Sequence, residues 1–143
     1  MCLSAIFKRD CNASWTGIGY KVFIKGTLKN GRPAKSYTGQ IFGTDDQYIK
    51  GRVYRSDNMK TVQFNNWGRY NSEITADNGH PYPYGFHIFT NQRSAQSWRG
   101  KGRLSIVKVA YKEGHTLGVQ ENNPDQFLRV IVARQMKILE EIV

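Results

Sequence analysis

The stretch Tyr82–Tyr111, YPYGFHIFTNQRSAQSWRGKGRLSIVKVAY, predicts a strand, a short helix and a second strand in direct succession. Its first part, Gly85–Thr90, is dense in large apolar residues, which is typical of a buried strand. Thr90 and Asn91 can cap a helix N-terminus, and Gln92–Arg99 has room for two helical turns. We expect this unit to organise the rest of the fold.

Alternation of apolar and polar residues predicts further strands on both sides of this unit. The expected strands are Gly19–Leu28, Ser36–Phe42, Gln47–Arg55, Thr61–Phe64, Arg103–Tyr111 and Gln126–Arg134. Turns or loops are expected at Lys29–Pro33, Gly43–Asp46, Ser56–Gly79, Lys112–Gly114 and Glu121–Asp125. The last segment, Gln135–Val143, fits either a strand or a short helix. These elements predict an α+β fold, an antiparallel sheet with one or two short helices, in a single domain spanning residues 1–143.

The chain carries a large positive charge. Its formal net charge is +10 at pH 7 and its pI is about 9.8. Such an excess favours an anionic partner, namely a nucleic acid, a nucleotide, a phosphate or an acidic surface, although charge also keeps proteins soluble. No apolar run approaches the ~20 residues of a membrane helix, and the N-terminus lacks the layout of a signal peptide. We therefore expect a soluble, cytoplasmic protein without a membrane partner.

Cysteine and histidine spacing predicts neither a disulfide framework nor a metal site. Cys2 and Cys11 are too few for either, and His80, His87 and His115 lack the spacing of metal ligands. No metal or cofactor is therefore expected. His87 alternates with apolar residues and is interpreted as a structural histidine. Removal of Met1 would expose Cys2 as an N-terminal nucleophile, and the alternative is an ordinary thiol.

Two groups of polar residues are candidates for binding an anion. The first lies where the predicted helix begins, because free backbone N–H groups there attract phosphate, and Asn91 and Arg93 add an amide and a guanidinium. The second is the pair Arg129 and Arg134, whose planar guanidinium groups suit phosphates. Their opposite parity in one strand directs them to opposite faces, so we expect one to meet the ligand. The alternative for the two arginines is a surface salt bridge with Glu140 or Asp125, and the alternative for the helix terminus is a cap that binds no ligand.

Aromatic residues in the same segments are candidates for stacking on a base. Tyr84 follows a proline in the approach to the first strand, and Phe89 ends that strand. Stacking of a base on an aromatic ring is worth ~1–3 kcal/mol. The alternative is that Phe89, like Phe86 and Trp98, belongs to the core. The expected ligand-binding residues are therefore Tyr84, Phe89, Asn91, Arg93, Arg129 and Arg134.

The central unit resembles the strand–helix–strand core of the ADP-ribosyltransferase fold. The residues that carry this resemblance are Gly85-Phe86-His87 in the first strand, with Ala95 and Trp98 in the helix. The resemblance implies an enzyme that acts on NAD or another nucleotide. Such an enzyme remains one alternative for this chain, and a small basic nucleic-acid-binding protein is another.

The whole chain resembles small phage proteins, and among them the Thoeris anti-defence sponges. The resemblance lies in the start Met-Cys-Leu and in the segments Gly-Tyr-Lys-Val-Phe, Gly-Phe-His-Ile-Phe and Arg-Val-Ile-Val-Ala. It implies an often oligomeric protein in the host cytoplasm that binds cyclic ADP-ribose-type immune signals and, in some members, cyclic oligonucleotides. Such proteins sequester the signal without cleaving it. The leading prediction is therefore a non-enzymatic binder of an anionic, nucleotide-derived small molecule, with a homo-oligomer expected.

Overall fold

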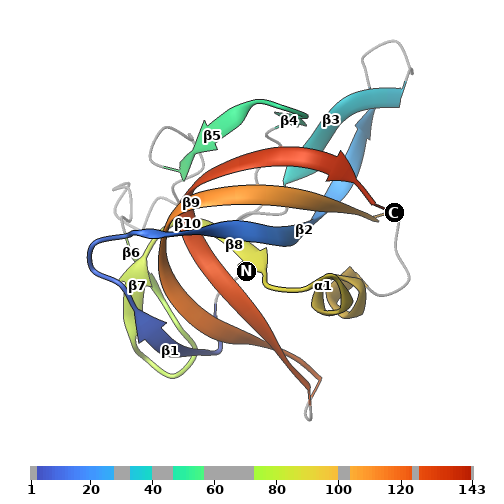
Figure 1. Cartoon of the computed structure of the whole chain (residues 1–143). Coiled ribbons are helices and arrows are strands. Elements are labelled where there is room, and N and C mark those ends of the chain that lie inside the picture. Colours follow the sequence, from blue (N-terminus) through green and yellow to red (C-terminus); the bar gives the residue numbers. More distant parts are fainter. Residues whose placement is uncertain are drawn as a thin grey trace, which may run out of the picture.

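Strands dominate the computed structural model, and one helix lies beside them (Figure 1). The structure describes residues 3–27, 33–39, 47–56, 73–99, 104–123 and 126–142. The first seven strands are β1 (Ala5–Arg9), β2 (Trp15–Thr27), β3 (Pro33–Gly39), β4 (Gln47–Ile49), β5 (Val53–Arg55), β6 (Glu73–Thr75) and β7 (Pro81–Pro83). They are followed by β8 (Phe86–Phe89), α1 (Gln92–Arg99), β9 (Leu104–Asn123) and β10 (Gln126–Glu141). The predicted α+β class is confirmed.

The long antiparallel hairpin of β9 and β10 forms the centre of the sheet. The first half of β9 pairs with β2, and its second half pairs with β1. In the same way β10 pairs with β8 along its first half and with β5 along its second. One residue pair, Tyr20 with Phe89, joins β2 to β8, so that β2, β9, β10 and β8 form a closed circuit of strands. β3 and β4 continue outward from β2.

Apolar side chains form two clusters on opposite faces of these strands. The first cluster contains Phe23, Tyr84, Phe86, Ile88, Val107, Val109, Tyr111, Ala133, Met136 and Ile138. The second contains Leu3, Val22, Ala76, Tyr82, Phe89, Ala95, Ile106, Leu128, Val130 and Val132. Helix α1 and the β6–β7 hairpin contribute to the second cluster, which explains why both faces of β8 are buried.

The central strand–helix–strand prediction is confirmed. All four residues of β8 are buried, and α1 has the predicted bounds Gln92–Arg99. The Asn91 side chain caps the helix, because its Oδ1 accepts a hydrogen bond from Ser94 N at 2.8 Å. Ala95 is buried against the sheet, and Trp98 packs on Phe89 with 6.0 Å between ring centroids.

The predicted turn at Lys112–Gly114 is wrong, because β9 runs through it. The residue partners shift there: Thr116 pairs with Val132, whereas Gly114 pairs with Ala133, so His115 is an extra residue in β9. Glu113 takes a left-handed conformation with a φ of 55°. A β-bulge therefore absorbs the turn-forming residues without ending the strand.

Other boundaries also differ from the predictions. The C-terminal segment is a strand up to Glu141, and the strand predicted at Gln47–Arg55 divides into β4 and β5 at Gly51, whose φ is 86°. The expected loop Ser56–Gly79 contains the strand β6 (Glu73–Thr75), which pairs with β7 and is followed by a turn up to Gly79. The loop expected at Glu121–Asp125 is wrong for Glu121–Asn123, which belong to the end of β9. The predictions for residues 29–33, 43–46, 61–64 and Cys2 lie largely or wholly outside the described residues. No helix of the described chain is long and apolar enough to cross a membrane.

Candidate functional site

The beginning of α1 brings together three of the six predicted ligand-binding residues. Phe89 at the end of β8 pairs with Val130, and Thr90 N donates a hydrogen bond to Arg129 O at 3.2 Å. Arg129 therefore lies on the strand beside Thr90, immediately before the Asn91 cap and Arg93. The fold thus places residues that are almost forty positions apart in the chain at one end of the helix.

Positive charge at this end of α1 is not neutralised by described residues. The side chains of Arg93 and Arg129 are exposed, and no carboxylate of a described residue lies within ion-pair distance of either. The first turn of α1 also has no acidic residue. The exposed guanidinium groups of Arg93 and Arg129 and the partial positive charge of the helix terminus each lack a counter-charge among the described residues, which favours an anion near this end of α1.

The two predicted stacking residues lie in the core, on opposite faces of the sheet. Tyr84 is 9% exposed in the first cluster, and Phe89 is 1% exposed in the second. The fold does not bring them together. Within residues 82–99, Trp98 is the aromatic side chain that is not buried, and it contacts Phe89. It is therefore the aromatic ring of this unit that a ligand could reach most directly.

Arg134 belongs to a different group of cationic side chains. It lies five residues beyond Arg129, which is roughly 16 Å along an extended strand. The charges of Arg134 and Arg9 both act on His115, the extra residue of the bulge. The Arg9 guanidinium also donates to Pro81 O at 3.5 Å. The predicted pair of arginines is thus divided between two places on β10.

His115 is a buried imidazole with one unsatisfied nitrogen. Its side chain is 2% exposed, Nδ1 lies 2.7 Å from Thr116 Oγ1, and Nε2 has no hydrogen-bond partner among the described residues. The pKa of His115 is lowered to about 4, mainly because burial disfavours the charged imidazolium. The positive charges of Arg134 and Arg9 lower the pKa further, and a hydrogen bond with the Tyr84 backbone raises it. His115 is therefore uncharged at neutral pH.

The free energy of unfolding is expected to fall as the pH drops from 6.5 to 4, by about 3 kcal/mol from His115 alone. The unfolded chain binds a proton near pH 6.5, whereas the folded imidazole resists protonation until about pH 4. Urea titrations at pH 7 and pH 4.5 measure this loss. His115→Gln should reduce the difference between the two pH values, and an undiminished difference in that variant would contradict the assignment.

A buried lysine is the functional candidate that sequence reasoning missed. The Lys21 side chain on β2 is 5% exposed, and its Nζ donates to His87 O at 2.7 Å, with the Phe23 ring centroid 5.6 Å away. Burial lowers its pKa from 10.5 to about 7. The sequence signal was its parity with Phe23, which placed both on one strand face. No sequence signal pointed to its acceptor.

His87 is a structural histidine, as predicted. Its Nδ1 lies 3.2 Å from Gly85 O, and its Nε2 lies 2.9 Å from Tyr82 Oη, which in turn accepts from Leu3 N at 2.9 Å. A neutral imidazole with its hydrogen on Nδ1 satisfies every hydrogen bond in this series. Nδ1 then donates to Gly85 O, and the Tyr82 hydroxyl donates to Nε2. Burial holds the pKa of His87 well below its usual value.

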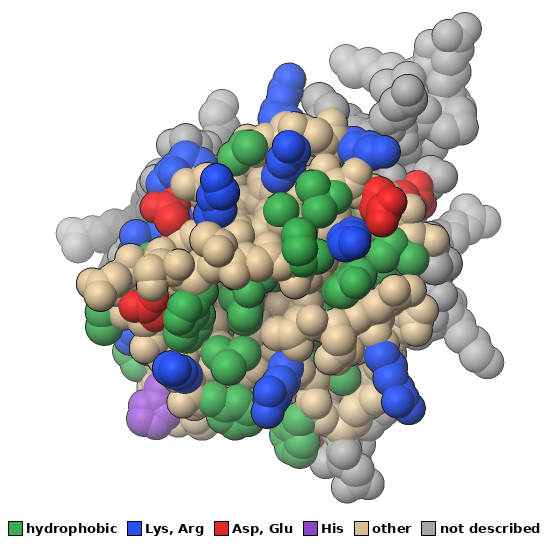
Figure 2. Space-filling model, viewed as in Figure 1, with side chains coloured by type: hydrophobic (Ala, Val, Ile, Leu, Met, Phe, Trp, Pro, Cys, Tyr) green, Lys and Arg blue, Asp and Glu red, His purple; other side chains and the backbone are tan. Residues whose placement is uncertain are grey.

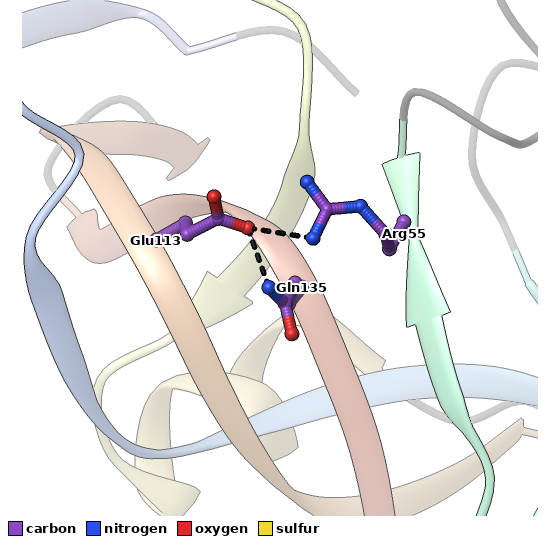
Figure 3. Close-up of polar contacts among 3 residues, drawn as sticks. All are labelled: Arg55, Glu113 and Gln135. Atoms are coloured by element: carbon purple, nitrogen blue, oxygen red, sulfur yellow. Dashed lines mark hydrogen bonds and ion pairs between the residues drawn. The ribbon is translucent and has the colours of Figure 1, made fainter.

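Glu113 in the bulge joins β5 to the central hairpin (Figure 3). Its Oε2 lies 3.1 Å from Arg55 Nη1 and accepts from Gln135 Nε2 at 2.6 Å. Because both partners point at one carboxylate oxygen, this acidic side chain is held by its neighbours. We interpret it as a structural contact and not as a catalytic acid or base.

The described residues do not assemble a metal site. They contain no group of three or more His, Cys, Asp and Glu side chains that could hold a metal ion. Cys11 is an exposed free thiol in the turn before β2. No family model, curated protein or solved structure matches this chain.

Proposed function

We propose that the protein binds an anionic, nucleotide-derived small molecule at the beginning of α1. The observation that supports this most directly is that the backbone of Arg129 lies beside Thr90, next to the Asn91 cap and Arg93, and that neither arginine has a neutralising carboxylate among the described residues. Phosphate oxygens accept hydrogen bonds from guanidinium groups in a bidentate geometry and also bind at helix N-termini. Within residues 82–99, Trp98 is the aromatic side chain that is not buried, so it is the one in this unit that could contact a base.

Sequestration without cleavage is the activity we propose for this site. Its support is the resemblance to the Thoeris anti-defence sponges, which implies a phage-encoded, oligomeric binder of cyclic ADP-ribose-type signals in the host cytoplasm. The proposed role is therefore to lower the free concentration of an immune signal by mass action.

A thermal-shift screen tests this proposal. Candidate ligands are NAD, ADP-ribose, cyclic ADP-ribose isomers, and cyclic di- and trinucleotides. A ligand at 100 times its dissociation constant adds roughly 2.7 kcal/mol to the free energy of unfolding. A cyclic nucleotide that stabilises the protein and is recovered intact would support sequestration. Consumption of NAD would instead indicate an ADP-ribosyltransferase-like enzyme.

Substitutions at the helix terminus separate binding from folding. Arg129→Ala is expected to weaken the ligand about ten- to a hundredfold, as loss of a charge-assisted hydrogen bond implies. Asn91→Asp is the matched variant, because aspartate caps a helix as well as asparagine but repels an anion. It should keep the stability of the free protein and lose affinity. Unchanged affinity in both variants, with the fold intact, would exclude this site.

Arg134→Ala tests the second cationic group in the same titration. Its distance from Arg129 along β10 predicts a smaller effect on affinity than that of Arg129→Ala. If Arg134→Ala abolishes binding and Arg129→Ala does not, the ligand lies instead near His115 and Arg9.

A further inference from the structure

A second surface lies on the outer side of β5, β10, β9 and β2, away from the first cluster. Residue pairs across these strands define it in three rows. One row runs Val53, Lys137, Ala110, Ile18. The row on one side is Arg55, Gln135, Lys112 and the row on the other is Glu140, Lys108, Tyr20. Directly paired residues project to the same side of a sheet, so these side chains share one surface, the outer face.

The outer face is both apolar and basic. Ile18 is 48% exposed and Val53 is 56% exposed, and they stand at the two ends of the middle row. Figure 2 looks onto these strands and shows hydrophobic side chains among lysines and arginines, with no described element in front of them. An exposed strip of this composition is typical of an interaction surface.

Three lysines on the outer face stand close together. Lys137 is the direct partner of Ala110, so Lys108 and Lys112 are its diagonal neighbours, at about 7–8 Å between Cα atoms. Lys108 is paired in register with Glu140, but no ion pair joins them within 4 Å, and none joins Lys112 or Lys137 to a described carboxylate. The fold thus assembles like charges whose repulsion a bound polyanion would relieve.

We infer that the outer face binds single-stranded nucleic acid. Lysines of this spacing can follow a phosphate backbone, while the exposed side chains of Ile18 and Val53 offer apolar contact to unstacked bases. A second copy of this chain would set the same positive face against itself, so charge disfavours it as the occupant. This surface is separate from the α1 site and goes beyond the proposed function.

Fluorescence anisotropy with labelled single-stranded DNA and RNA of about 12 nucleotides tests the inference. We expect the logarithm of the binding constant to fall with the logarithm of salt concentration, with a slope near −2 for three lysine–phosphate contacts. Lys137→Glu and Lys112→Glu should each weaken binding at least tenfold. Ile18→Ser should weaken it several-fold without a change of charge.

Lys8→Glu is the matched control, because it alters the net charge equally but lies on β1, which pairs with the other half of β9. Its affinity should stay within about threefold of the wild type, once correct folding is checked by circular dichroism. Three results would each overturn the inference. These are an equal loss of affinity in Lys8→Glu, tighter binding of a duplex than of a single strand, and no binding of nucleic acid at all. None of these results bears on the α1 site, since Arg129→Ala and the cyclic-nucleotide screen report on it separately.

Discussion

Lys21→Met is expected to raise the free energy of unfolding by roughly 3–4 kcal/mol at pH 7. The folded protein lowers the pKa of this amine from 10.5 to about 7, because burial disfavours its charged form. At 1.36 kcal/mol per pKa unit, burying the charged amine lowers the free energy of unfolding by about 5 kcal/mol when the folded and unfolded chains are both protonated at Lys21. Loss of the hydrogen bond to His87 O offsets about 1 kcal/mol of the gain.

The pH dependence identifies Lys21 as the cause. Between about pH 7 and pH 10.5 the unfolded chain holds a proton that the folded amine has lost. The free energy of unfolding contributed by this group therefore rises with pH across that window, and below pH 7 the full penalty is present. Urea titrations of the wild type and Lys21→Met should diverge as the pH falls from 10 to 7.

Lys50→Met is the control for the loss of a lysine, since Lys50 is exposed in the turn between β4 and β5. It should follow the wild type at every pH. If Lys21→Met is less stable than the wild type at pH 7, or if the two proteins change in parallel with pH, then the buried amine does not carry an electrostatic penalty.

Tyr82→Phe is expected to lower the free energy of unfolding by about 4 kcal/mol. The Tyr82 hydroxyl accepts from Leu3 N and pairs with His87 Nε2, and all three groups are buried. Removing the hydroxyl leaves both neighbours without this partner, at about 1–3 kcal/mol each. The same substitution at Tyr20, which is half-buried, should cost under ~0.5 kcal/mol.

A double-mutant cycle with His87→Leu checks that the loss comes from this hydrogen bond. The two changes remove opposite ends of one contact, so their combined effect should be smaller than the sum by at least ~1 kcal/mol. A strictly additive pair, or a Tyr82→Phe protein as stable as the wild type, would show that the Leu3–Tyr82–His87 chain contributes little.

The local features of the fold could be predicted from the sequence. Helix α1 has its predicted bounds because its cap residue and its apolar spacing lie within ten residues of one another. The run Phe86–Phe89 is predictable as a buried strand for the same reason, since both its faces are apolar. In both cases short-range chemistry and tertiary packing favour the same structure.

The features that depend on strand register could not be predicted. Gly114 looks like a turn residue, and only its pairing with both Trp15 and Ala133 shows that β9 continues through it. The burial of Tyr84 and the proximity of Arg129 to Thr90 depend likewise on the alignment of β8 with β10. Alignment between distant segments is a property of the whole sheet, which a single sequence does not display.

The pairing of β2 with β9 also has a consequence for how the chain folds. Trp15 pairs with Gly114 and Ile24 with Leu104, so the contacts span some eighty to a hundred residues. The chain loses the conformational entropy of closing loops of that length before strand pairing stabilises the fold. This order predicts folding in milliseconds to seconds. During synthesis β2 would leave the ribosome long before its partner strand. Its apolar and cationic residues would then be exposed to other chains until β9 and β10 follow, which makes this interval the one most open to aggregation.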